Sequence, residues 1–342
     1  MTTSPRVSVL MPVYNGDRHL RESIRSILSQ TFREFEFIIV DDGSTDDSVE
    51  IVQSFKDSRI QLISNTRNEG LARSLNRGLD IARGEYVIRM DADDISLPRR
   101  ISVQVDFMDS RSELGAAGTW IRHFDETGRK DVFRYSTDPK IIRCEVLFDS
   151  PLGHPTVIIR KNLFQSKGLK YDETFPYAQD YDLWSRATEQ VSLSNIPRVL
   201  LLYRKYPPSE RTTNFERQQD FAALIRRRQL GRIDIVPTDG EFRVHQALSL
   251  SAFHGADEEF VTKASLWLQK LKDSNGRKGV FPEPFFSRVL GGKWLDLCYS
   301  ASGSAARKVR QFFRSSLSRD VLTDWNRHRK RIFSAGFAHI SD

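Results

Sequence analysis

The chain has 342 residues and carries 52 Lys and Arg against 45 Asp and Glu, which gives a formal net charge of +7. With 39% hydrophobic and 28% charged residues, the composition is that of a globular protein and argues against a disordered or fibrous chain. The two cysteines, Cys144 and Cys298, lie too far apart for a CxxC pair and suggest no disulfide framework, so a reducing cytoplasm is the expected compartment.

Strand and helix patterns alternate over the first hundred residues. Short apolar runs predict buried strands at 7–14, 35–43, 60–64 and 85–94. A helical stripe follows each run, and the last of these stripes, which opens at Pro98, carries Ile101, Val105 and Met108. This rhythm predicts right-handed crossovers and a mostly parallel sheet that helices cover on both faces, the arrangement of a Rossmann-type α/β fold.

The rhythm changes after about residue 113. Further strands are predicted at 113–124, 132–135, 154–161 and 198–205, and helices from Pro139 and at 177–190. Beyond the sequence Tyr206-Pro207-Pro208 the chain reads as helices, for instance at 214–230, with a loop expected at 273–279. The sequence therefore predicts an α/β domain over 1–208 and a helical C-terminal region over 209–342.

The positive charge is concentrated at one end of the chain. Residues 1–205 carry 29 basic and 30 acidic side chains, whereas residues 301–342 carry 9 basic and 3 acidic ones. A nucleic-acid-binding protein needs basic residues interleaved with aromatic ones on a binding face, so the neutral first part argues against that class. In the basic tail, apolar residues recur at helical spacing over 306–319. This helix could lie on an anionic membrane surface or close the domain with its charges solvated.

Apolar segments long enough to cross a membrane are not expected. The longest runs, such as 37–40 and 199–203, fall short of the roughly 20 residues that a spanning helix needs. The first residues, MTTSPRVSVL, lack the pattern of a signal peptide. We therefore expect a cytoplasmic protein, with the basic tail as its one candidate for peripheral attachment to the inner face of a membrane.

Acidic residues follow two of the predicted strands. Asp41 and Asp42 end the second strand, and the sequence Asp-Ala-Asp-Asp at 91–94 ends the fourth. In an open parallel sheet ligands bind beyond the carboxyl ends of the strands, so the two groups converge on one edge. Strand alternation would put Asp91 and Asp93 on the same side, where a divalent cation such as Mg²⁺ or Mn²⁺ would relieve their repulsion. The alternative is a solvated turn in which Asp94 or Ser96 caps the next helix.

Three further residues are candidates for a site. Asp180 and Asp182 are two positions apart on a predicted helix whose apolar side continues through Trp184, so at most one, Asp180, can enter a site. An acid in the first turn can equally well complement the helix dipole. His154, before a proline at a strand start, could bind an acceptor or be structural, and Tyr14 could stack on a base or pack.

Five segments together resemble the family 2 glycosyltransferases of GT-A fold. The similarity runs in order over roughly residues 5–205, at separations typical of the family. The segments are VSVLMPVYNG (7–16), FIIVDDGSTDDS (37–48), NEGLARSLNRGLDIARGEYVIRMDADDISLPRR (68–100), HPTVIIRK (154–161) and QDYDLW (179–184).

The resemblance implies an inverting enzyme that transfers a sugar from a nucleotide-diphosphate sugar, UDP by family habit, to a saccharide or lipid-linked acceptor. The 1–208 domain is then catalytic, and cell-surface polysaccharide or glycoconjugate synthesis is the expected setting. Asp180 falls where the family places its general base. His154 would lie on the acceptor side. The implied cofactor is a divalent cation, Mg²⁺ or Mn²⁺, with Asp93 as the direct ligand and Asp91 as a ribose or metal contact.

The nucleotide-facing residues follow from the same resemblance. Pro12 and Tyr14 match the loop beside the base, and Asp42 matches the residue that hydrogen-bonds it. Asn68, which opens the third segment, is placed with the residues that bind the nucleotide sugar.

The chain departs from the family pattern at three places. Gln179 stands where relatives often carry Glu before the base, and Leu75-Asn76 replaces the common Arg-Asn. Relatives frequently have Tyr-Arg-x-His at the end of the catalytic region, and here Tyr206 takes the His position. Nucleotide binding is therefore more strongly implied than dependence on a metal.

Two other enzyme classes place acids at strand ends. A phosphotransferase or phosphohydrolase would need an Asp nucleophile with a second Asp two residues later, whereas DDGST has adjacent acids. A sugar nucleotidyltransferase would begin with a Gly-rich loop that contains Arg or Lys, which Pro12-Val13-Tyr14-Asn15-Gly16 lacks.

Overall fold

The protein is described by a computed structural model that covers residues 5–206, 212–253, 255–302 and 304–318. The chain forms two compact units. The first comprises the residues up to 142 together with 150–222, and the second comprises 143–149 and the residues from 223 onward. The first unit is α/β, as the sequence predicts, and the second is helical.

The elements of the first unit alternate in the predicted order. Its strands are β1 (Val7–Val13), β2 (Phe35–Asp41), β3 (Ile60–Ser64), β4 (Tyr86–Arg89), β5 (Ile95–Ser96), β6 (Leu114–Asp125), β7 (Gly128–Phe133), β8 (Ile158–Arg160) and β9 (Ser192–Arg204). Its helices are α1 (Asp17–Leu28), α2 (Ser48–Ser54), α3 (Leu71–Ile81), α4 (Arg100–Asp109), α6 (Lys161–Ser166), α7 (Gln179–Ala187) and the 3₁₀ turn η1 (His154–Thr156).

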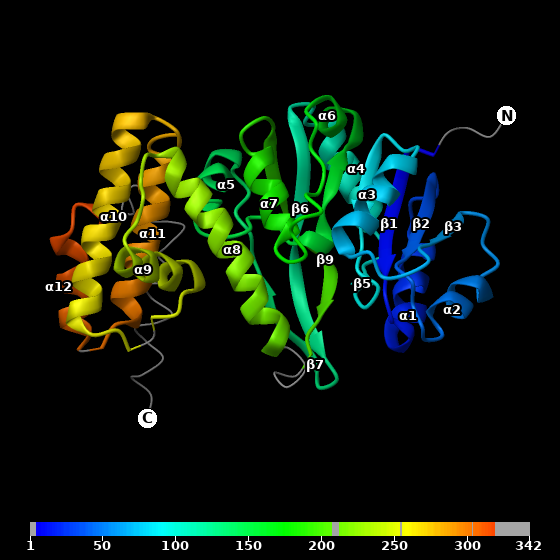
Figure 1. Ribbon diagram of the computed structural model, residues 1–342, viewed down its shortest axis with the longest axis horizontal. Coiled ribbons are helices and arrows are strands. Elements are labelled where there is room, and N and C mark those ends of the chain that lie inside the picture. Colours follow the sequence, from blue (N-terminus) through cyan, green and yellow to red (C-terminus); the bar gives the residue numbers. More distant parts are fainter. Residues whose placement is uncertain (1–4, 207–211, 254, 303, 319–342) are drawn as a thin grey trace. The chain divides into compact units, whose positions relative to one another are not determined.

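Among the described residues, nine strands form one sheet in the order β3-β2-β1-β4-β8-β6-β9-β5, with β7 beside β6. Strands β3, β2, β1 and β4 are parallel, which confirms the predicted Rossmann-type half. Because β1 pairs with both β2 and β4, the carboxyl ends of these three strands meet at one edge (Figure 1). Strand β8 runs antiparallel to its neighbours β4 and β6, and β9 runs parallel to β6.

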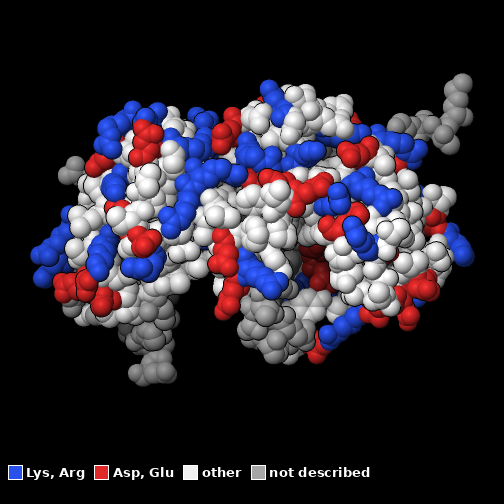
Figure 2. All heavy atoms as spheres, in the orientation of Figure 1, with Lys and Arg blue, Asp and Glu red and all other residues white. Residues whose placement is uncertain are grey.

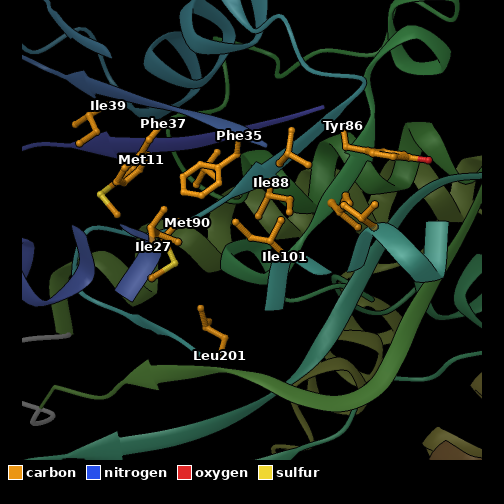
Figure 3. Packing of buried hydrophobic residues seen from close by; sticks show 14 of the residues in the cluster. Met11, Ile27, Phe35, Phe37, Ile39, Tyr86, Ile88, Met90, Ile101 and Leu201 are labelled. Carbon is orange, nitrogen blue, oxygen red and sulfur yellow. The ribbon is translucent and has the colours of Figure 1, made fainter. Parts of the chain in front are cut away.

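The larger part of the core lies on the sheet face that α1 and α4 cover. Buried side chains of β1, β2 and β4 meet Ile27 of α1 and Ile101 of α4, and the facing strand residues include Met11, Phe37, Ile39, Ile88 and Met90 (Figure 3). Complete burial of such a side chain contributes about 2 kcal/mol. The predicted inward residues of α4, namely Ile101, Val105 and Met108, are all buried. This packing fixes the strands whose ends carry the candidate site.

The fourth strand is shorter than predicted, and this changes how its acids are placed. Strand β4 ends at Arg89, and residues 91–94 form a turn rather than a continuation of the strand. The turn is held from two sides, because the backbone carbonyl of Asp94 accepts a hydrogen bond from Ser23 Oγ and its carboxylate accepts one from the backbone N–H of Arg204. Asp91 and Asp93 are therefore not on a strand, and the predicted reason for their lying on the same side, strand alternation, is wrong.

The predicted strand at 154–161 also differs from the structure. Residues 154–156 form the 3₁₀ turn η1, and the strand β8 begins only at Ile158. Thr156 causes the turn, because its backbone N–H and its hydroxyl both donate to the carbonyl of Gly153. His154 therefore lies in a tight turn and not at the start of a strand. The predicted strand at 132–135 is likewise displaced, since β7 ends at Phe133.

The second unit consists of helices α9 (Asp239–Leu250), α10 (Glu258–Lys278), α11 (Phe285–Ser300) and α12 (Ala305–Arg314), and α5 (Pro139–Glu145) and α8 (Thr212–Arg232) lead into it. The loop predicted at 273–279 is wrong, because α10 continues to Lys278 and ends at Gly279, whose φ is +66°. Asn275 stabilises this end by exchanging two hydrogen bonds with the backbone of Phe281.

The basic tail lies only partly within the described residues, since 319–342 fall outside them. In the part that the structure describes, Phe312 and Leu317 are buried and Phe313 is 55% exposed. Trp294 Nε1 donates to the carbonyl of Phe312 at 3.3 Å. This segment thus packs on its own unit through one side and presents Phe313 on the other. None of the helices in the described ranges combines the length and the apolar character needed to cross a membrane.

Candidate functional site

Three carboxylates meet in the turn that follows β4. One oxygen each of Asp91, Asp93 and Asp94 lies within 4.8 Å of the others. Figure 2 shows acidic side chains inside a hollow of the surface, at the place where Figure 1 draws β5. The acidic cluster that the sequence predicts at this edge is therefore formed, although by a turn and not by a strand.

Asp94 supports the turn from below. Its side chain is fully buried, Oδ1 accepts from the backbone N–H of Arg204 at 2.8 Å, and Oδ2 has no hydrogen-bond partner among the described residues. Burial, followed by the negative charges of Asp91 and Asp93, raises the pKa of Asp94 well above its ordinary value. Asp94 therefore belongs to the interior of the turn, whereas Asp91 and Asp93 are partly exposed and can face a ligand. The alternative that Asp94 or Ser96 caps α4 is wrong, because no side chain caps that helix.

Arg89 backs the acidic turn, and the sequence reasoning missed it. This buried side chain donates from Nη1 to Asp91 Oδ2 at 2.5 Å, and Nη2 contacts Asp91 Oδ1, so the pair is bidentate. A second buried arginine, Arg100, donates to the carbonyls of Arg89 at 2.6 Å and Pro155 at 2.8 Å. Burial lowers the pKa of Arg100 to about 9. A charged residue within the apolar run VIRM was the available signal for Arg89.

Tyr206 forms a hydrogen bond with one carboxylate oxygen of Asp93. The tyrosine hydroxyl donates to Asp93 Oδ2 at 2.8 Å, and burial together with this hydrogen bond raises the pKa of Tyr206. The phenol therefore remains a donor at neutral pH. Asp93 and Asp91 offer hard carboxylate oxygens of the kind that Mg²⁺ and Mn²⁺ prefer, so the donor set fits such a cation.

Asp42 organises the loop after β3. It is 4% exposed and accepts three hydrogen bonds, from Asn65 Nδ2 at 2.7 Å and from the backbone N–H groups of Glu69 and Gly70 at 2.9 Å each. Gly43 lets the backbone of Arg67 lie close to the end of β2, because a methyl group on Gly43 would be 2.5 Å from that backbone. Its φ of +75° also favours glycine. Asp42 thus holds the loop after β3 against the end of β2.

The other residues predicted to face the nucleotide lie at the same edge. Pro12 is buried in β1, Tyr14 follows that strand and is 50% exposed, and Asn68 is exposed in the loop that Asp42 holds. A methyl group on Gly16 would lie 3.7 Å from Ala92 Cβ, so the loop after β1 touches the acidic turn. The structure therefore brings the ends of β1, β2 and β4 together as predicted.

Asp180 lies in the first turn of α7. Ser150 Oγ donates to its Oδ2 at 3.3 Å. Asp182 is fully buried and pairs with Arg186 at 2.6 Å between Oδ2 and Nη2, so it takes no part in a site. Asp182 is thus held inside the unit, Asp180 remains the predicted site residue of this helix, and no side chain of α7 acts as an N-terminal cap.

His154 is paired with a residue that the sequence did not single out. Its Nε2 lies 2.8 Å from the hydroxyl of Tyr171, and Asn76 fixes Tyr171 by hydrogen bonds to both its backbone N–H and its carbonyl. Burial, with the nearby charge of Arg89, lowers the pKa of His154 well below its ordinary value. His154 is therefore neutral at physiological pH.

Comparison with known proteins gives two kinds of similarity. The profile of Glycosyl transferase family 2 matches residues 8–163. An uncharacterized glycosyltransferase of Haemophilus influenzae is 32% identical over 67% of this chain and 75% of its own length. The amylovoran biosynthesis glycosyltransferase AmsE of Erwinia amylovora is 31% identical over 58% of this chain and 75% of its own.

Solved structures share the fold at low sequence identity. Residues 1–349 of TarS from S. aureus, in complex with UDP-GlcNAc, superpose with a TM-score of 0.57 at 19% identity, over 93% of this chain and 92% of that one. The mannosyltransferase PcManGT of Pyrobaculum calidifontis, in complex with GDP-Man and Mn²⁺, gives a TM-score of 0.52 at 16% identity, over 94% and 87%. The fold is thus that of GT-A glycosyltransferases.

Proposed function

The chain belongs to Glycosyl transferase family 2 and is a glycosyltransferase, and we propose that it transfers a sugar from a UDP-sugar to a hydroxyl of a saccharide or lipid-linked acceptor. The setting that we propose is the assembly of a cell-surface polysaccharide or glycoconjugate. The observation that carries the proposal is the division of acids into two roles. Asp91 and Asp93 lie in a turn that Arg89 supports, whereas on α7 Asp182 forms a buried ion pair with Arg186 and Asp180 accepts a hydrogen bond from Ser150.

Asp180 suits the role of general base. A sugar hydroxyl is a poor nucleophile, so a carboxylate within hydrogen-bond reach must accept its proton as it attacks the anomeric carbon. Ser150 orients the Asp180 carboxylate by donating a hydrogen bond to one of its oxygens. With a single carboxylate in this role, direct displacement with inversion of the anomeric centre is the proposed course.

The residues at the strand ends suit the nucleotide diphosphate. Tyr14 offers an exposed ring just after β1, and Asp42 holds the loop that carries Asn68. We propose Asp93, with Asp91 beside it, as the ligands of a divalent cation, Mg²⁺ or Mn²⁺. When bound, such a cation stabilises the negative charge of a departing diphosphate as a Lewis acid. The Mn²⁺ in the mannosyltransferase structure supports this assignment.

His154 is proposed to lie on the acceptor side, because its turn follows the loop that carries Ser150.

Peripheral attachment to an anionic membrane is proposed for the basic tail, in which Arg310, Phe313 and Arg314 are exposed. Such attachment would suit a lipid-linked acceptor.

A thermal-shift screen of UDP-, GDP- and dTDP-sugars with and without Mn²⁺ tests the proposal, followed by product analysis with the best ligand. We expect a UDP-sugar to raise the unfolding temperature because it binds the folded state, and the product to be free UDP. Release of inorganic phosphate or pyrophosphate would instead point to a phosphotransferase or a sugar nucleotidyltransferase. Failure of every nucleotide sugar to bind would overturn the proposal.

A further inference from the structure

Four aromatic side chains of the first unit form a continuous strip over β6, β7 and β9. The strip consists of His123 on β6, Phe133 on β7, Tyr135 just after β7, and Tyr203 on β9. The ring centroids of Tyr135 and Phe133 are 4.8 Å apart, those of Phe133 and His123 are 6.5 Å apart, and those of His123 and Tyr203 are 5.8 Å apart. We refer to these residues as the aromatic strip.

The aromatic strip is only partly buried. Phe133 is 50% exposed, and the other three rings are partly accessible to solvent. The strip is nonetheless fixed in place, because Trp120 Nε1 donates to the carbonyl of Tyr135 at 3.0 Å and Arg134 lies over the Trp120 ring, 5.4 Å from its centroid. An ordered group of accessible rings is typical of a binding surface.

The strip is joined to the loop that carries the acceptor-side residues. A methyl group on Gly153 would lie 2.9 Å from the hydroxyl of Tyr135, so the Tyr135 ring packs on the backbone next to His154. Asn195 Nδ2 donates to the carbonyl of Ser136 at 2.7 Å and to that of Pro151 at 3.1 Å. The segment after β7 and the loop at 150–154 are therefore fastened together.

That loop leads directly to the proposed base. Ser150 at its start donates to Asp180, and His154 at its end contacts Tyr171. A ligand that lies along the aromatic strip and reaches Gly153 thus arrives beside the residues assigned to the acceptor hydroxyl. The nucleotide-facing residues are on other elements, at the ends of β1 and β2.

We propose that the aromatic strip is the platform on which a saccharide acceptor binds; this inference rests on the proposed function and adds the class of acceptor. A pyranose ring has an apolar face of C–H groups that stacks on an aromatic ring, while its hydroxyls stay hydrated or bond to polar edges. The strip offers such rings and continues to Gly153 in the loop that carries Ser150, the hydrogen-bond partner of Asp180. The occupant that we assign to it is therefore a sugar chain, whose rings can stack while one hydroxyl reaches the proposed base.

Binding of disaccharides tests the proposal without knowledge of the natural acceptor. Cellobiose, maltose, chitobiose and xylobiose are titrated against the full chain saturated with UDP, and saturation-transfer NMR reports the bound sugar. We expect at least one of them to bind the wild type and to bind Phe133→Ala about fivefold to tenfold more weakly, since one exposed stacking contact is lost. Tyr299→Ala removes an aromatic residue that is 45% exposed in the second unit and serves as the matched control.

The outcomes separate this inference from the proposed function. If a disaccharide binds equally well to the wild type and to Phe133→Ala, or if none binds to a wild type that does bind UDP, the aromatic strip is not the acceptor platform. If binding to phosphatidylglycerol vesicles depends on Phe133 and disaccharide binding does not, the strip contacts lipid instead. If UDP fails to bind at all, the proposed function itself is wrong. Unchanged UDP binding by Phe133→Ala shows that the variant is folded.

Discussion

The hydroxyl of Tyr206 donates a hydrogen bond to Asp93, with 2.8 Å between Oη and Oδ2. Asp93 is the proposed cation ligand, and Tyr206 stands where relatives of this family frequently carry a histidine. A histidine could share a cation with Asp93, whereas the phenol hydroxyl competes with the cation for a carboxylate oxygen. The contact predicts that a cation must displace or rearrange Tyr206 when it binds.

Tyr206→Phe should therefore increase the affinity for Mn²⁺. Loss of one hydrogen bond to a charged acceptor, worth about 1.5 kcal/mol, corresponds to roughly tenfold tighter binding of the cation. Isothermal titration with Mn²⁺ in the presence of UDP measures this change. Tyr299→Phe, far from Asp93 in sequence and in the other unit, is the control. Weaker binding in Tyr206→Phe would show that Tyr206 assists the cation.

Asp180→Asn should abolish sugar transfer and leave UDP-sugar binding intact. The amide keeps the shape of the side chain but cannot accept a proton, so we expect a loss of about 10²- to 10⁴-fold in kcat. Turnover and the thermal shift with a UDP-sugar are measured on the same preparation. Asp182→Asn is the comparison, because it breaks the buried pair with Arg186 and should lower stability instead. Near-normal turnover of Asp180→Asn would remove Asp180 from the role of base.

Arg89→Met should destabilise the first unit. The substitution leaves the Asp91 carboxylate without its bidentate partner in a largely buried turn, which we expect to cost about 2 kcal/mol in the free energy of unfolding. Arg89→Lys retains the positive charge but cannot donate two parallel hydrogen bonds to the Asp91 carboxylate, so it should cost less. Urea unfolding measures both variants. The double variant Arg89→Met with Asp91→Asn should recover part of the loss, and strictly additive effects would show that the two side chains do not interact.

His245 should make the second unit sensitive to acid. Trp267 Nε1 donates to its Nδ1 at 3.2 Å, its Nε2 lies 3.0 Å from the carbonyl of Leu147, and burial lowers the pKa of His245 to about 3. An unfolded histidine has a pKa of about 6.5, so below that pH the unfolded chain binds the extra proton. The stabilisation is complete above pH 6.5 and declines as the pH falls toward 3.

Urea unfolding at pH 7 and pH 5 measures this dependence. We expect His245 to account for a loss of about 2 kcal/mol between the two values. His245→Phe should lack that part of the loss, whatever its stability at pH 7, and Trp267→Phe, which keeps the imidazole, should retain it. The same pH dependence in His245→Phe and the wild type would contradict the assignment.

The exposed side of α12 should bind anionic vesicles if the basic tail attaches the protein to a membrane. Removal of the whole tail is a poor test, because Phe312 and Leu317 are buried in the second unit. The double variant Arg310→Gln with Arg314→Gln keeps those contacts. Each basic residue near a charged surface contributes about 1 kcal/mol, so co-sedimentation with phosphatidylglycerol vesicles should weaken by more than tenfold. Equal binding by variant and wild type, or no binding by either, would dismiss the attachment.

Local patterns in the sequence were sufficient for the order of elements in the first unit. Short apolar runs and helical stripes report which side of an element is buried, and the buried residues Ile101, Val105 and Met108 follow directly from them. The sequence also indicated that Asp180 and Asp182 cannot both enter one site, since residues two positions apart on a helix face different ways. The end of α10 was not predictable in this way, because Asn275 reads as a loop residue but bonds to the backbone of Phe281 beyond Gly279 and so stabilises the last turn of the helix.

The length and composition of the chain determined that it is globular, and the charge count placed most of its net positive charge in the last 42 residues. Its motifs determined its family and the acids at the strand ends. Tertiary structure alone decided what those acids contact. Asp94 is buried beneath the turn, Asp91 pairs with Arg89, and Tyr206 reaches Asp93 from 113 positions along the chain. The physical reason is that burial and hydrogen-bond partners set the charge of a carboxylate, and partners distant in sequence become neighbours only when the sheet is assembled.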